Sequence, residues 1–134
     1  MYFTDSPTKN IYAFDYEASS GNISNRRVFF RLEEAAEPDG LVIDVDGHIW
    51  TALYGTGKVL RLSPEGKVVG EIHLPTRYVT CPCFGGPDLD ELFITTAAEA
   101  QPEKEPESAR HGGNIFRVKV GVRGLQKHKF RYYK

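Results

Sequence analysis

Hydrophobic and polar positions alternate in short runs along most of the chain, which is the period-two pattern of half-buried β-strands. The runs are rich in β-branched and aromatic residues and are bounded by Gly, Pro, Asn or Asp. The predicted strands are residues 1–5, 10–16, 27–32, 41–44, 48–53, 58–62, 67–74, 78–84, 91–95, 114–119 and 127–132. No long stretch has a helical period, so the pattern predicts an all-β fold.

One strand pattern recurs three times along the chain. Its aligned positions are Tyr2, Trp50 and Phe93; Thr4, Ala52 and Thr95; and Ile11, Val59 and Ile115. A period of roughly 40–50 residues with four strands and aromatic anchors is typical of β-propeller blades. We expect an incomplete blade at residues 1–35, a full blade at 36–76 and a full blade at 77–134. Three blades do not close a ring, so we expect a partial propeller whose open edges could support self-association.

Turn residues divide the connections into two kinds. Those at 19–22, Asp46-Gly47 and Glu65-Gly66 are predicted to be tight hairpins. The others vary in length, and in an up-and-down sheet they lie together at one end, which is the expected binding side. The longest, residues 97–113, is rich in Glu, Pro and Ala. We expect it to be a mobile, solvated surface loop, with a lid over a pocket as the alternative.

Composition excludes some classes of function. The net charge is −1, so nothing favours binding to nucleic acid or to an anionic membrane. The basic, aromatic tail at 127–134 is interpreted as an outer strand. No apolar run approaches the roughly 20 residues of a transmembrane helix, and the first residues lack a basic or apolar leader. We therefore expect a cytoplasmic protein.

Two cysteines, Cys81 and Cys83, are separated by one residue. In a strand they point to one face and cannot bridge each other without strain. They are predicted to be small buried core residues in a reducing compartment. A zinc site would need further soft ligands at workable spacing, and the sequence offers none.

Several motifs in order carry a family resemblance. They are I-S-N-R-R from Ile23, P-D-G followed by a hydrophobic strand and D-x-x-G-x-hydrophobic-W, and C-F-G-G from Cys83. Together they resemble the regucalcin/gluconolactonase family, which also includes luciferin-regenerating relatives, from Met1 to about Phe130. The resemblance implies blades of a six-bladed propeller that binds one divalent metal, calcium or zinc, and hydrolyses sugar lactones.

The family's P-D-G aspartate maps onto Asp39. The resemblance thus implies that Asp39 is a metal ligand and that it serves in catalysis as a proton acceptor, although P-D-G alone is also a common turn sequence. The family's other metal ligands, a Glu and an Asn, and its substrate-binding residues precede the matching segment. We therefore expect metal-dependent lactone hydrolysis, acting on a small-molecule lactone, that is incomplete in this chain. The alternatives are a non-catalytic truncated fragment and a calcium-binding regulatory protein.

Other acidic residues are weaker candidates. Asp5 begins a connection on the same side as Asp39 but has no counterpart in the family's ligand set. The pairs Asp88/Asp90 and Asp44/Asp46 are interpreted as solvated turns at the opposite end. The four histidines show no zinc spacing, and the glycines at 55–57 join two strands rather than opening a helix around a phosphate.

Overall fold

A computed structural model describes residues 1–100, 103–128 and 132 of the chain. Its described part contains ten strands and one short helix, so the all-β prediction is confirmed. The strands are β1 (Tyr2–Asp5), β2 (Asn10–Tyr16), β3 (Ile23–Arg31), β4 (Glu37–Ile43), β5 (Ile49–Tyr54), β6 (Lys58–Leu62), β7 (Val68–His73), β8 (Val79–Gly85), β9 (Glu91–Thr96) and β10 (Ile115–Lys119).

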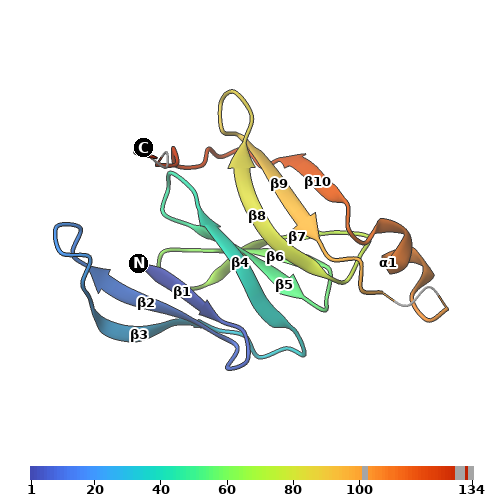
Figure 1. Ribbon diagram of the computed structural model, residues 1–134, viewed down its shortest axis with the longest axis horizontal. Helices are drawn as coiled ribbons and strands as arrows, with labels where there is room; N and C mark the ends of the chain where they lie inside the picture. Colours follow the sequence, from blue (N-terminus) through green and yellow to red (C-terminus); the bar gives the residue numbers. More distant parts are fainter. Residues whose placement is uncertain (101–102, 129–131, 133–134) are drawn as a thin grey trace.

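The strands form three antiparallel sheets, each in chain order: β1-β2-β3, β4-β5-β6-β7 and β8-β9-β10. Figure 1 shows β4 between β1 and β8, and β4 contacts both of them. Positions aligned in the sequence repeat are cross-strand partners in the sheets: Thr4 with Ile11, Ala52 with Val59, and Thr95 with Ile115. The repeat is therefore one hairpin built three times. Among the described strands β1 pairs with β2 alone, and self-association through such an edge stays a prediction.

Strand β5 of the middle sheet is buried on both faces because each neighbouring sheet packs against one of them. Successive side chains of a strand point to opposite faces, so Ile49 and Leu53 of β5 join a core cluster with the first sheet. Trp50 and Ala52 of the same strand join a second cluster with the third sheet. Every residue of β5 except Tyr54 is buried. This double packing stacks the sheets side by side and brings the ends of their strands together.

Two of the predicted tight turns, at Asp46-Gly47 and Glu65-Gly66, are confirmed, while the connection around 19–22 has six residues between β2 and β3. Gly47 and Gly66 have positive φ angles of 81° and 77°, which glycine adopts without steric cost. The Gly47 amide donates to the Asp44 carbonyl over 3.1 Å and the Gly66 amide to the Ser63 carbonyl over 2.9 Å. These hairpins lie at one end of the sheets, and the insertion at 97–113 follows β9 at the other end.

The insertion at 97–113 contains a helix, α1 (Pro106–His111), where a loop was expected. Proline at its start and a basic last turn suit a helix, because Pro is preorganised there and cations stabilise the negative end. Ser108 of α1 is buried, so the expectation of a solvated spacer is wrong at this point. The helix has only six residues, and no helix within the described ranges is long and apolar enough to cross a membrane.

Two further predictions concern the cysteines and a last strand at 127–132. Cys81 and Cys83 do share one face of β8, but both are exposed, so their assignment to the core is wrong. The alternate residues Pro82 and Phe84 take the buried face instead. Of the predicted strand at 127–132, residues 129–131 lie outside the described part of the chain, while 127 and 128 carry no strand.

Candidate functional site

The variable connections meet at one end of the sheets, as predicted, and this end is hollowed. A cavity of about 270 Å³ opens there between the β1–β2 connection, the start of β4, the end of β5 and the insertion. The residues lining it are Ser6, Glu37, Asp39, Tyr54 and Glu99. An adjoining cavity of about 340 Å³ shares Glu37 and Tyr54 with it. The predicted site residue Asp39 therefore lies in a cavity at the expected end.

Asp39 lies within β4 rather than in the linker before it, because the strand begins two residues earlier, at Glu37. The pairing of β4 with β5 is irregular between Pro38 and Leu41, so Asp39 sits in a β-bulge. Bulges re-aim side chains at functional positions. Gly40 allows the close approach of β8, because a Cβ there would lie 2.5 Å from the Sγ of Cys81. The P-D-G sequence thus places a carboxylate at the seam between two sheets.

The surroundings of Asp39 in the cavity raise the pKa of its carboxyl. Burial raises the pKa of Asp39 above the ordinary aspartate value, the Gly40 amide hydrogen bond opposes that rise, and the nearby charge of Glu37 adds to it. Tyr54 donates its hydroxyl hydrogen to the Glu99 carboxylate. That hydrogen bond, with burial and the charge of Glu99, raises the pKa of Tyr54 to about 12, so the phenol stays protonated at neutral pH.

The donor chemistry of this cavity fits a hard divalent cation. Its described lining offers carboxylate and hydroxyl oxygens and no sulfur or imidazole nitrogen. Oxygen donors suit calcium, whereas zinc favours nitrogen and sulfur ligands. The three carboxylates are not preassembled, since the only group of three His, Cys, Asp or Glu within 4.8 Å among the described residues is Asp44, Asp46 and His48. Residues Glu37 and Glu99 were not found by sequence reasoning, because neither lies in a recognisable motif.

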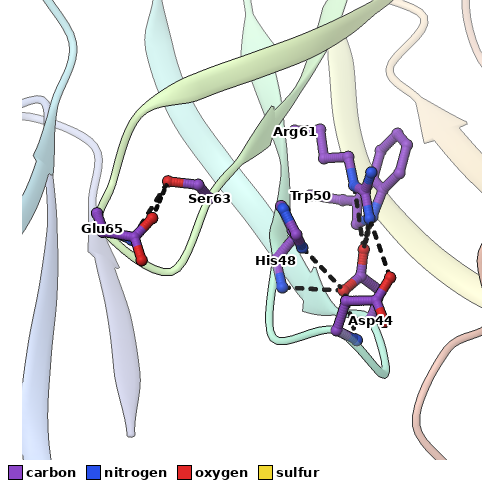
Figure 2. A network of polar contacts seen from close by, with 7 residues as sticks. Asp44, His48, Trp50, Arg61, Ser63 and Glu65 are labelled. Atoms are coloured by element: carbon purple, nitrogen blue, oxygen red, sulfur yellow. Dashed lines mark hydrogen bonds and ion pairs between the residues drawn. The ribbon is translucent and has the colours of Figure 1, made fainter.

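The Asp44 group is a structural network rather than a free ligand set (Figure 2). Its Oδ1 accepts hydrogen bonds from the backbone amides of Asp46 and His48 at 3.1 and 2.9 Å. Its Oδ2 accepts from Trp50 Nε1 at 3.0 Å and from Arg61 Nε and Nη2 at 3.1 and 2.7 Å. Five donors occupy both oxygens of a side chain that is fully buried. No lone pair remains for a metal without breaking these bonds.

The interpretation of Asp44/Asp46 as a solvated turn is therefore half right. Asp46 is exposed, but Asp44 is buried and paired with Arg61. Burial opposes ionisation of Asp44, yet the hydrogen bonds from Arg61, the His48 amide and Trp50 outweigh it, and its pKa is lowered. The sequence signal was present: Trp50 is a repeat anchor and Arg61 is its cross-strand partner.

The remaining acidic candidates behave as predicted. Asp88 and Asp90 lie in the β8–β9 turn, at the opposite end from the Asp39 cavity, and Asp90 pairs with Lys119 at 3.3 Å. Asp5 ends β1 but is not among the described residues that line the cavity, where its neighbour Ser6 takes part instead.

Comparison with known proteins identifies close relatives. The profile of the SMP-30/Gluconolactonase/LRE-like region matches residues 1–98. Regucalcin of Bos taurus is 40% identical over 128 residues, covering 93% of this chain and 43% of the relative. The Bacillus subtilis (strain 168) protein YvrE, named a sugar lactone lactonase, is 39% identical over 128 residues, covering 94% and 44%.

A solved structure extends the likeness to the fold. Regucalcin from Agrobacterium tumefaciens str. C58, described as a calcium-binding protein, superposes with a TM-score of 0.88 at 28% identity. The match covers 98% of this chain and 45% of that one. The chain therefore spans less than half the length of these relatives, and its three sheets are blades of a partial β-propeller, as predicted.

Proposed function

This chain belongs to the SMP-30/gluconolactonase/LRE-like family, and from that membership we propose that its Asp39 cavity takes part in metal-dependent hydrolysis of sugar lactones. One observation carries the proposal. The aspartate of the P-D-G motif lines a cavity at the variable end of the sheets, among oxygen donors alone. A partly buried carboxyl of raised pKa in a cavity is a common feature of functional sites.

The described residues have distinct roles in this proposal. Asp39 offers an anionic oxygen to hold a divalent cation, with Glu37 and Glu99 near enough to line the same cavity. When bound, such a cation polarises a carbonyl and lowers the pKa of water. Asp39 accepts the proton of the attacking water, whose oxygen bonds to the lactone carbonyl carbon. The ring C–O bond then breaks, and the ring oxygen takes up the proton to give the open hydroxy acid.

Calcium is the cation that we propose, because the lining provides oxygen donors and calcium takes six to eight of them. The alternative function is calcium binding without catalysis. The observation that favours it is the same donor set, together with the description of the Agrobacterium relative as a calcium-binding protein. The chain spans less than half of its relatives' length, so both functions are proposals for this segment.

The test is hydrolysis of D-glucono-1,5-lactone with and without calcium, in the wild-type chain and in Asp39→Asn. We expect calcium-dependent hydrolysis that falls about 100-fold or more in the variant, the usual size of a lost general base. Asp46→Asn is the matched control, because it removes an exposed aspartate outside the cavity. Equal rates in Asp39→Asn and Asp46→Asn would refute the role of Asp39. Calcium binding without hydrolysis in the wild-type chain would favour the alternative.

A further inference from the structure

The insertion supplies one wall of the Asp39 cavity. Glu99 follows β9 in the first part of the insertion, and its carboxylate lines the cavity while accepting a hydrogen bond from Tyr54. We propose that Glu99, held in place by Tyr54, is a specificity-determining residue that makes this cavity favour neutral, hydroxyl-rich ligands over anionic ones. The inference rests on the proposed function, because it concerns which ligand that same cavity accepts.

Two tyrosines each hold one glutamate of the insertion. Tyr54 ends β5 and Tyr78 precedes β8, and an isolated β-bridge joins them. Their ring centroids lie 5.1 Å apart. Tyr54 donates to Glu99 and Tyr78 donates to Glu105 over 3.1 Å, so each ring fixes one glutamate of the insertion.

The second half of the insertion is also docked. The Arg77 amide donates to the buried Ser108 hydroxyl over 2.9 Å, and Ser108 lies 3.2 Å from the Thr76 hydroxyl. The Arg77 guanidinium pairs with Glu105 as well. With α1 anchored in this way and Glu99 held by Tyr54, the carboxylate of Glu99 has a defined place in the cavity wall.

Glu99 adds to the negative charge of the cavity, and this charge is what disfavours anionic ligands. Glu37, Asp39 and Glu99 are three carboxylates, and no cationic side chain is among the described residues that line the cavity. One divalent cation would leave this set net negative. A wall of one sign repels ligands of that sign, while carboxylate oxygens accept hydrogen bonds from sugar hydroxyls. Hydrolysis converts a neutral lactone into an anionic hydroxy acid, so the same charge would also promote release of the product.

Two ligands with the same number of carbon atoms distinguish the effect of ligand charge from the effect of ligand shape. D-Glucitol is neutral, and D-gluconate carries a carboxylate at its first carbon. We would measure both dissociation constants by NMR titration in metal-free buffer, for the wild-type chain, Glu99→Gln, Tyr54→Phe and Glu103→Gln. Glu103→Gln is the matched control, because it neutralises an exposed glutamate of the same insertion that does not line the cavity.

The wild-type chain should bind glucitol more tightly than gluconate. Glu99→Gln should reduce that preference about fourfold, the size of a Coulomb repulsion between unit charges about 5 Å apart in a water-like medium. Glu103→Gln should leave the preference unchanged. Tyr54→Phe should reduce it by less and should speed amide hydrogen exchange at residues 97–100, a readout that needs no ligand.

Some results would overturn the inference. If Glu99→Gln keeps the wild-type preference, or if the wild-type chain binds gluconate as well as glucitol, Glu99 sets no selectivity. Unchanged exchange at 97–100 in Tyr54→Phe would refute the role of the tyrosine. These outcomes are distinct from failure of the proposed hydrolysis: a preference that falls as expected, with hydrolysis that survives Asp39→Asn, would refute the catalytic proposal and retain this one.

Discussion

Asp44→Asn should destabilise the fold strongly, although Asp44 is remote from the proposed chemistry. The buried carboxylate accepts five hydrogen bonds from the β4–β5 turn, Trp50 and Arg61. Asparagine has one carbonyl oxygen, so it satisfies either the turn amides or the Trp50 and Arg61 donors. The other donors then face an amide NH₂ group.

The magnitude follows from which donors lose their partner. Removing one member of a buried ion pair costs about 3–5 kcal/mol, but the Arg61 side chain is 24% exposed and keeps part of its hydration. An unsatisfied buried Trp50 N–H adds about 1–3 kcal/mol. With the discount for Arg61, we expect Asp44→Asn to lower the free energy of unfolding by about 3–4 kcal/mol.

Urea unfolding followed by Trp50 fluorescence measures this change. With a slope of about 2 kcal/mol per M, the midpoint should fall by about 1.5–2 M. Asp46→Asn is the control, because Asp46 is exposed and its 3.7 Å ion pair with Arg61 should contribute less than about 1 kcal/mol. A midpoint for Asp44→Asn no lower than that of Asp46→Asn would refute the network as a source of stability.

Three further outcomes are expected. Gly40→Ala should cost about 1–3 kcal/mol in urea unfolding, because its Cβ would lie 2.5 Å from Cys81 Sγ; an unchanged midpoint would contradict this packing. Since the folded pKa of Asp44 is lowered, its contribution to stability is present above the unfolded pKa and lost as pH falls through the folded one. The wild-type chain should therefore lose stability in acid faster than Asp44→Asn, and parallel curves would show otherwise. Cys81 and Cys83 should both react with a thiol reagent in the folded chain, Cys81 more slowly because partial burial of its sulfur raises its pKa; protection of both would place them in a core.

The alternation of hydrophobic and polar residues predicted most of the strands. Their pairing was also predictable, because each strand pairs with the next one along the chain. The repeat positions Thr4 and Ile11, or Ala52 and Val59, face each other because short turns set the register. The features that were missed depend on irregularities or long-range contacts. A register shift near Val79 precedes the segment in which the cysteines take the exposed face of β8, and an unpredicted bulge places Asp39 within β4.

The site was predictable only in part for the same reason. The P-D-G motif drew attention to Asp39, which lies in a cavity at the end of the sheets where the variable connections meet, and its role stays a prediction. Glu99 lies in a polar insertion with no periodic pattern, and only Tyr54, 45 residues earlier, brings it to the cavity. Asp44 has the sequence of an ordinary turn, and the arginine that pairs with its carboxylate lies 17 residues later in the chain.

The most direct test is a calcium titration of the wild-type chain followed by amide NMR shifts. Two acidic groups compete as the site, and they lie in different connections: the Asp39 cavity and the Asp44–His48 turn. We expect saturable shifts at the amides of Asp39, Gly40 and Tyr54 that are absent in Asp39→Asn. Shifts centred on Asp46 and His48, or no saturable shift at Asp39 and Gly40, would contradict the assignment of the cavity as the functional site.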